Sequence, residues 1–338
     1  EGQAIRRHPE FALGHRNLLQ QIDYEKGTIF LDGKDYPLLD TNFPTIDPAD
    51  PCRFTEQEAD IMDRLAKAFM GCEKLQKHMK FLLANGSLYK VYNNNLLYHG
   101  CVPLNEDGTL KEVEIYGRRY KGRALYDVLD NYVRKGFVAV DEEEREKGRD
   151  LMWYIWLSEN SPLFGKDKMA TFERYFLAEK ETHREVKNPY YKFLENEEVV
   201  DRILREFGLE PEGAHIINGH VPVKSKDGES PIKCGGKLLI IDGGFSRAYQ
   251  KETGIAGYTL IYNSYGLILA AHRPFESTEA AIENESDIHS DSTVVKWVAR
   301  RKRVGDTDTG QELREKIKDL ERLLEAYYSG AIAEKFTG

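Results

Sequence analysis

The chain has 338 residues and a formal net charge of −9, with hydrophobic residues at 41% and charged residues at 31%. This is the composition of a soluble globular protein with one large or two ordinary domains. No apolar run approaches the length of a membrane-spanning helix. The only dense basic cluster is residues 300–303, which argues against a nucleic-acid-binding protein. The four cysteines form no Cys-x-x-Cys pair, which favours reduced thiols in a cytoplasmic protein.

The first part of the chain predicts a hairpin and a long helix. Asp32-Gly33 stands at the turn of a strand-like segment, residues 27–38. Thr55 and Glu58 form a capping-box pattern, and apolar residues then recur at helical spacing until Asn85-Gly86. We therefore expect residues 1–85 to form an N-terminal segment with a short helix, a hairpin and one long helix.

The central part, residues 86–275, predicts a mixed α and β domain. Residues 122–208 are mostly helical in pattern, and Trp153 and Trp156 within them are typical of core aromatic residues. A helical insertion is therefore expected at about residues 102–208. Strands are expected at residues 88–92, 96–99, 113–120 (a hairpin), 214–218, 237–241, 258–262 and 267–271.

The last part, residues 276–338, predicts a polar linker and a C-terminal helix. Residues 276–294 are polar, and Thr309 and Glu312 form a second capping-box pattern. Apolar residues line one face of the helix that follows, and this face is expected to dock on the main body.

Two histidines and one aspartate stand where apolar strands end. His99 follows one such run and is followed by Gly100, while His220 follows another after Gly219. Asp242 ends a third run and precedes two glycines. Each residue alone is more typical of a core histidine or a turn aspartate. Together, from distant parts of the chain, they favour one metal site assembled at the rim of a sheet.

This order of motifs resembles the later half of the calcineurin-like metallophosphoesterases. Within that superfamily the chain is similar to class III fructose-1,6-bisphosphatase, the Firmicutes type, over nearly its whole length. The resemblance implies an α/β (α+β) fold: the C-terminal half of a metallophosphoesterase β-sandwich with a large helical insertion and a C-terminal helix. The segments that carry the resemblance are residues 95–104, 169–176, 180–183, 187–191, 240–250 and 254–260.

The chain departs from the family in lacking its front motifs, Asp-x-His, Gly-Asp-x-x-Asp-Arg-Gly and Gly-Asn-His-Asp. Asp287-Ile288-His289 imitates Asp-x-His but follows no apolar strand, and Gly305-Asp306 is not followed by an Asp-Arg pair at the right spacing. No general acid or other catalytic residue is identifiable. We therefore expect a C-terminal portion of a longer enzyme that is inactive without its N-terminal half.

The resemblance implies roles for the three motif residues. His99 and His220 would bind one ion of a dinuclear Mn²⁺ centre, and Asp242 would orient the neighbouring loop or an imidazole. The complete enzyme would hydrolyse the 1-phosphate of fructose 1,6-bisphosphate by two-metal hydroxide attack, giving fructose 6-phosphate for gluconeogenesis. Candidate substrate-binding residues are Arg247, Tyr249, Lys251, Tyr258, Lys180, His183 and Arg184.

Two other functions stay open. The chain could be an interaction module, a half-enzyme that assembles with a separate N-terminal chain. It could also be part of a broader metallophosphatase that acts on phosphoproteins or dinucleotides. The expected partners are fructose 1,6-bisphosphate and the missing N-terminal half, and a homo-oligomer is open; no nucleic acid and no membrane is expected.

Overall fold

The computed structural model of the chain describes residues 2–275, 277–285 and 290–332, so the Asp287-Ile288-His289 sequence lies outside the described residues. The chain divides into two compact units. Unit 1 comprises Glu1–Lys90 and Tyr98–Gly208, and unit 2 comprises Val91–Leu97 and Leu209–Gly338. Both contain helices and strands, so the mixed α and β class is confirmed. The three-segment division expected from the sequence cuts the chain at other positions and stays a prediction.

Unit 1 begins with a short helix and a small sheet. Helix α1 (Gly2–Arg7) is followed by a three-stranded sheet of β1 (Ile22–Asp23), β2 (Thr28–Leu31) and β3 (Lys34–Pro37). Strands β2 and β3 are antiparallel, and Asp32 and Gly33 between them have φ of 50° and 84°. These left-handed residues make the tight hairpin turn that the Asp-Gly pair predicts.

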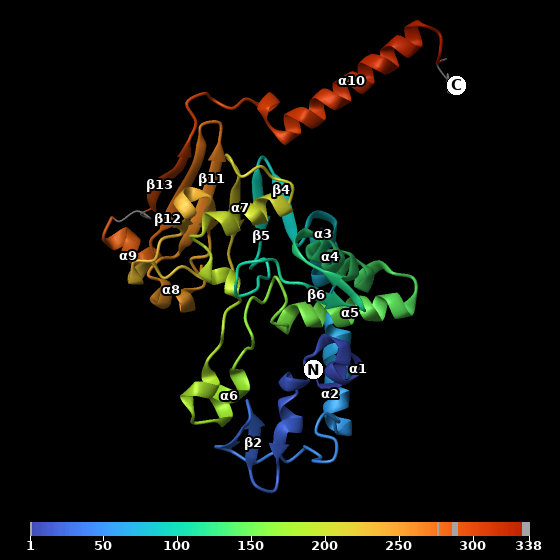
Figure 1. Cartoon of the computed structure of the whole chain (residues 1–338), viewed down its shortest axis with the longest axis vertical. Coiled ribbons are helices and arrows are strands. Elements are labelled where there is room, and N and C mark those ends of the chain that lie inside the picture. Colours follow the sequence, from blue (N-terminus) through green and yellow to red (C-terminus); the bar gives the residue numbers. More distant parts are fainter. Residues whose placement is uncertain (1, 276, 286–289, 333–338) are drawn as a thin grey trace. The chain divides into compact units, whose positions relative to one another are not determined.

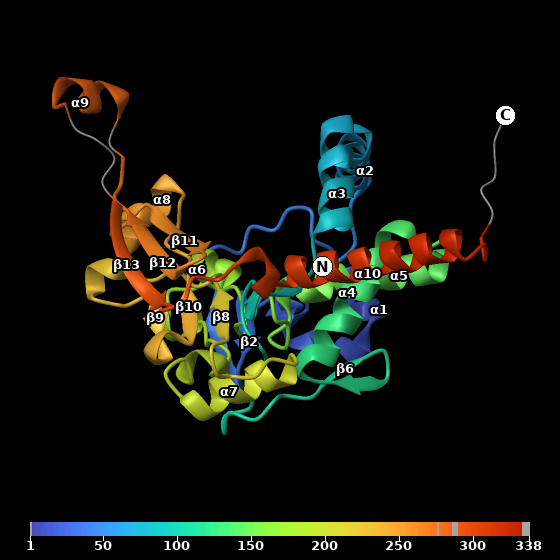
Figure 2. The same ribbon diagram turned by 90° about the horizontal axis from the view of Figure 1, so that it is seen from above.

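The expected long helix is two successive helices, α2 (Glu56–Gly71) and α3 (Glu73–Asn85) (Figure 2). The capping box of Thr55 and Glu58 is confirmed. The prediction of one helix was wrong at Cys72, whose φ of −79° and ψ of 99° are not helical. Apolar spacing continues through this one-residue break and hides it. Neither helix contains a buried residue, so its apolar stripe is not part of a core.

The main core of unit 1 lies between two longer helices, α4 (Gly122–Val138) and α5 (Glu142–Leu157). Gly136 and Gly148 bring their backbones together, because a Cβ on Gly148 would stand 2.6 Å from the Cα of Gly136. Around this crossing a hydrophobic cluster is buried, which includes Phe11, Val113, Ile115, Leu125, Leu129, Leu151, Tyr154 and Ile155.

The remaining elements of unit 1 are short. The hairpin predicted at residues 113–120 is confirmed as β6 (Val113–Ile115) and β7 (Arg118–Tyr120). The stretch at residues 122–208 is helical only in part, because irregular segments and 3-10 turns separate its later helices. Those helices are α6 (Thr171–Phe176) and α7 (Glu197–Glu206).

Unit 2 is built on a five-stranded sheet in the order β4-β5-β8-β10-β9. Strands β5, β8 and β10 are parallel, and β9 is antiparallel to β10. The strands are β4 (Tyr89–Tyr92), β5 (Asn95–Tyr98), β8 (His215–Asn218), β9 (Ile232–Lys233) and β10 (Leu238–Ile240). Residues 88–92, 96–99, 214–218 and 237–241 were predicted as strands, and all four are confirmed.

A second, antiparallel sheet of unit 2 has the order β11-β12-β13 (Figure 1). It consists of β11 (Gly257–Asn263), β12 (Gly266–His272) and β13 (Ser290–Trp297). Ile217, Leu239 and Leu267 form one buried cluster that joins the two sheets. Strand β13 corrects the expectation of a polar linker, since it pairs with β12 from Ser290 to Trp297, with one irregularity at Val295. Its residues are mostly exposed, which is why its sequence is polar.

The helices of unit 2 are α8 (Arg247–Thr253), α9 (Thr278–Glu283) and α10 (Asp308–Tyr328). Thr307, and not the predicted Thr309, caps α10 by accepting a hydrogen bond from the Gly310 N–H. Gly310 is the one buried residue of α10, so the expected docking of its apolar face does not occur within unit 2. None of the helices among the described residues has the length and apolar character needed to cross a bilayer.

Candidate functional site

The three motif residues follow the parallel strands of unit 2's sheet. Leu97 of β5 and Leu239 of β10 are both paired in register with Ile217 of β8. The carboxyl ends of these strands therefore lie at one edge of the sheet. His99 is the first residue after β5, while His220 and Asp242 come two residues after β8 and β10. The outer edge of parallel strands, at their carboxyl ends, is where α/β sheets commonly place ligands.

His220 stands in a strained turn. Its φ is 67°, in the left-handed region that a residue with a Cβ seldom adopts. The Val221 N–H donates to the Gly219 carbonyl at 2.8 Å across this turn. Residues held in such a conformation are concentrated at functional sites, because the surrounding structure must compensate the strain. The half-buried imidazole is thereby presented at the strand end rather than inside a core.

The turn with His220 is fixed to the segment that carries Asp242. The Ile241 N–H donates to the Asn218 carbonyl at 2.9 Å, and the Val223 N–H donates to the Asp242 carbonyl at 2.9 Å. The Asp242 carboxylate accepts a hydrogen bond from the Gly244 N–H at 2.9 Å and so shapes its own turn. This contact agrees with a role in orienting the neighbouring loop.

His99 is exposed and belongs to unit 1, whereas His220 and Asp242 belong to unit 2. Convergence of the two imidazoles on one ion stays a prediction. Among the residues that the structure describes, no group of three or more His, Cys, Asp or Glu side chains is arranged to hold a metal ion.

The first set of candidate substrate-binding residues lies in unit 2. Arg247, Tyr249 and Lys251 are on α8, directly after the Asp242 turn, and all three are exposed. Tyr258 differs, since it is buried in β11 at 5% exposure, and burial raises the pKa of its phenol. A buried phenol is poorly placed to reach a sugar hydroxyl.

The second set lies in unit 1. Lys180 and His183 belong to a 3-10 turn (Lys180–His183), and Arg184 caps its end. The His183 Nε2 is 3.0 Å from the Leu177 carbonyl oxygen, so this imidazole is engaged with the backbone of its own segment. A structural role therefore competes with substrate binding at His183.

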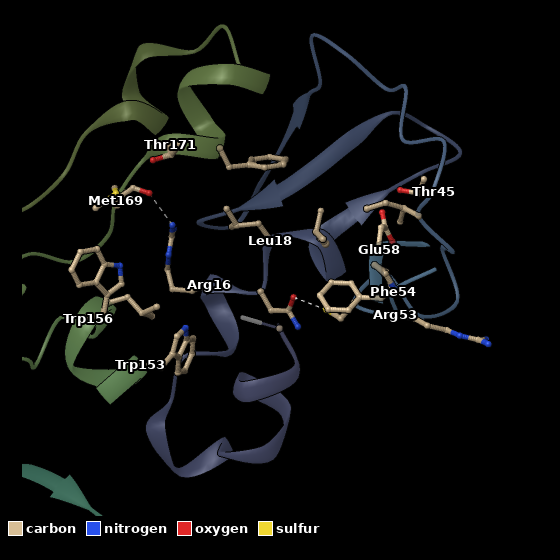
Figure 3. A pocket seen from close by; sticks show the side chains of 18 of the residues that line it. Arg16, Leu18, Thr45, Arg53, Phe54, Glu58, Trp153, Trp156, Met169 and Thr171 are labelled. Atoms are coloured by element: carbon tan, nitrogen blue, oxygen red, sulfur yellow. Dashed lines mark hydrogen bonds between the residues drawn. The ribbon is translucent and has the colours of Figure 1, made fainter. Parts of the chain in front are cut away.

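A cavity in unit 1 was not foreseen from the sequence (Figure 3). Its volume is about 800 Å³, and Trp153 and Trp156 of α5 line one side together with Arg16. Arg16 donates to the Met169 carbonyl at 3.2 Å and to the fully buried Glu173 carboxylate at 3.1 Å. Trp156 is 70% exposed, which corrects its assignment to the core. The two tryptophans were the only signal in the sequence, and they are equally typical of a core.

Comparison with known proteins identifies the family. The chain belongs to the Firmicute fructose-1,6-bisphosphatase family, which it matches over residues 1–329. It is 56% identical over 336 residues to the class 3 fructose-1,6-bisphosphatase of Clostridium novyi (strain NT) and 58% identical over 335 residues to that of Clostridioides difficile (strain 630). Each match covers 99% of this chain and 50% or 51% of the relative. The chain thus spans about half the length of the curated relatives it matches. No solved structure is significantly similar to it.

Proposed function

We propose that the chain is a working part of a sugar-phosphate phosphatase that converts fructose 1,6-bisphosphate to fructose 6-phosphate and phosphate. Membership of the fructose-1,6-bisphosphatase family supports the substrate and the class of reaction, hydrolysis of a phosphoric monoester. The observation that carries the proposal is the placement of His99, His220 and Asp242 within two residues of the carboxyl ends of three parallel, adjacent strands.

We further propose that the two sheets of unit 2 are the C-terminal half of a calcineurin-like β-sandwich. The buried cluster of Ile217, Leu239 and Leu267 supports this, because it joins the inner faces of two sheets. The link from β5 to β8 runs through the helices of unit 1, in keeping with a large helical insertion between these strands.

The side chains at the strand ends fit part of a Mn²⁺ site. Imidazole nitrogen and carboxylate oxygen are suitable donors for such an ion. The strained backbone of His220 supports a functional role for its imidazole. We propose that His99 and His220 bind as neutral imidazoles and that the remaining ligands come from outside the described residues. When bound at such a site, a pair of Mn²⁺ ions would supply an activated water and positive charge for the phosphoryl oxygens.

The residues of this chain would hold the turn that carries His220 and orient the substrate. The hydrogen bond from the Gly244 N–H keeps the Asp242 carboxylate at the base of its turn. The Asp242 carbonyl accepts a second hydrogen bond from the N–H of Val223, which follows the turn that contains His220. Together these bonds fix the backbone that presents His220. Arg247 and Lys251 on α8 bring two cations close in sequence to that turn, where they suit the second phosphate of the substrate.

A chimera tests the function. The 338 residues replace the segment that they match in the Clostridium novyi relative, and phosphate release from fructose 1,6-bisphosphate is measured with and without Mn²⁺. We expect Mn²⁺-dependent hydrolysis. A chimera that folds but prefers a phosphoprotein or a dinucleotide would contradict the proposed substrate.

Single substitutions in the chimera test the metal ligands. His99→Ala and His220→Ala should each lower both activity and bound Mn²⁺, counted by electron paramagnetic resonance, by roughly 100-fold or more, since loss of a supporting residue alone costs 10–100-fold. His78→Ala, which removes an exposed histidine of α3, is the matched control and should change neither. Full Mn²⁺ content in the His99 and His220 variants would remove these residues from the site.

We also propose that the 338-residue chain is inactive alone and works as a half-enzyme that needs further ligands. Purified chain should release no phosphate from fructose 1,6-bisphosphate at any Mn²⁺ concentration, and robust release would refute this. All four cysteines lie in the described part of the chain and none of them forms a disulfide bond there, which supports a reducing, cytoplasmic setting for the enzyme.

A further inference from the structure

Helix α10 carries a regular apolar stripe that nothing in unit 2 buries. The stripe consists of residues at alternating spacings of four and three, each between 41% and 64% exposed. A helix of 21 residues with such a face is not stable as a solvated element, because the apolar side chains gain nothing without a partner. The members of the stripe are Leu313, Ile317, Leu320, Leu324 and Tyr327.

The start of α10 is anchored in unit 2. The Asn93 N–H donates to the Asp308 carboxylate at 2.8 Å, and the Asp308 N–H donates to the Asn93 side-chain oxygen at 3.0 Å. The hydroxyls of Tyr92 and Thr309 are 2.7 Å apart. These bonds fix the first turn of the helix and leave the stripe beyond it exposed.

We propose that α10 pairs with the α10 helix of a second copy of this chain in a parallel, two-stranded coiled coil. The four-three spacing is the heptad pattern of such a seam, with Ile317 and Leu324 at a positions and Leu313, Leu320 and Tyr327 at d positions. A branched Ile at a with Leu at d favours two strands.

The residues at the e and g positions, which flank the apolar stripe of α10, are complementary to those of a second copy of the helix. In a parallel pair, each g residue faces the e residue five positions later on the other helix. Lys316 then faces Glu321 of the second copy, and Leu323 faces Tyr328. The first pair joins opposite charges and the second joins apolar side chains, and the two-fold symmetry of the dimer forms each pair twice. An antiparallel pair would instead place Lys316 against Leu323, although it would bring Arg314 near Glu321.

The length of the stripe sets the strength of the pairing. About two and a half heptads bury less area than a standard interface, so we expect a reversible dimer with Kd of roughly 1–100 µM. Sedimentation equilibrium of the 338-residue chain should show a monomer–dimer transition in this range. A chain that stays monomeric up to several hundred micromolar would overturn the proposal, whatever else then covers the stripe.

Substitutions separate the seam from the rest of the helix. Ile317→Asp with Leu320→Asp should abolish the dimer, whereas Lys318→Asp with Arg322→Asp, on the opposite face, should leave it unchanged. Circular dichroism verifies that each variant folds. Dimers that survive the seam variant would place the interface elsewhere and overturn the proposal.

Charge exchange tests the orientation. Lys316→Glu and Glu321→Lys should each weaken the dimer about tenfold, and the double variant should restore it. Leu324→Cys, in a Cys72→Ser background, should form a disulfide-linked dimer on mild oxidation, because identical positions face each other in a parallel pair. Rescue by Arg314→Glu with Glu321→Lys instead would overturn the parallel arrangement.

Discussion

The close approach of α4 and α5 in unit 1 depends on Gly148. A Cβ at this position would overlap the Gly136 nitrogen and would stand 2.5 Å from the Tyr132 carbonyl oxygen and 2.6 Å from the Gly136 Cα. All three atoms belong to the backbone of α4, so no side-chain rotation relieves the overlap. Gly148→Ala must therefore push α4 and α5 apart and open the buried cluster between them.

Two opposing effects set the magnitude. Alanine in place of glycine within a helix stabilises it by about 1 kcal/mol. Overpacking a close contact costs typically ~1–3 kcal/mol, and a backbone overlap belongs at the upper end. The net expectation for Gly148→Ala is a loss of about 2 kcal/mol, which for a unit of this size lowers Tm by roughly 4–8 °C.

The assay is urea and thermal unfolding followed by tryptophan fluorescence in a Trp297→Phe background, so that both remaining tryptophans, Trp153 and Trp156, report on α5. Gly71→Ala in α2 is the control, since a Cβ there meets nothing within 4 Å. It should be neutral or stabilising by up to ~1 kcal/mol. Gly148→Ala as stable as its parent would refute the steric argument.

Three further predictions concern charged and buried polar groups. Burial raises the pKa of Asp150, but hydrogen bonds and charge from Arg7 and His8 outweigh this effect and lower the pKa overall. Asp150 therefore stabilises the fold at pH above its ordinary pKa of about 3.9, and this contribution is lost as pH falls through the folded pKa. Asp150→Asn should flatten the acid limb of the stability–pH curve. Burial lowers the pKa of His215, so the unfolded chain binds the proton more tightly than the folded chain. Stability should therefore fall as pH drops below about 6.5, and His215→Gln should remove that pH dependence in urea titrations. Arg16→Ala leaves the fully buried Glu173 without its nearest cation and should cost about 3 kcal/mol in thermal unfolding, whereas Arg6→Ala at an exposed ion pair should cost less than ~1 kcal/mol; equal losses would contradict the burial argument.

Strong local signals gave the most reliable sequence predictions. The Asp32-Gly33 turn and the Thr55 capping box depend on backbone geometry within four residues, and both are confirmed. Apolar runs such as 214–218 also located the strands of the parallel sheet. These features need no knowledge of distant parts of the chain.

Features that depend on tertiary partners were missed. Strand β13 has a polar sequence because its side chains are mostly exposed, and only its pairing with β12 makes it a strand. Trp156 is as apolar as any core residue, yet it lines an open cavity. At the candidate site, the order of strands and the left-handed backbone of His220 could not be read from residue types, although the histidine itself was selected because it ends an apolar run.

Unit 2 is discontinuous along the chain, and this has a consequence for its folding and for any attempt to isolate it. Strand β5 leaves the ribosome well before its neighbour β8, because most of unit 1 is synthesised between them. The nascent strand must therefore wait, with its hydrogen-bonding edge unsatisfied, until Leu209 and the residues after it emerge. A fragment that starts at Leu209 would leave β8, whose four residues are all buried in the whole chain, as a bare edge strand, and we expect it to aggregate unless residues 88–97 are supplied as a separate peptide or by circular permutation.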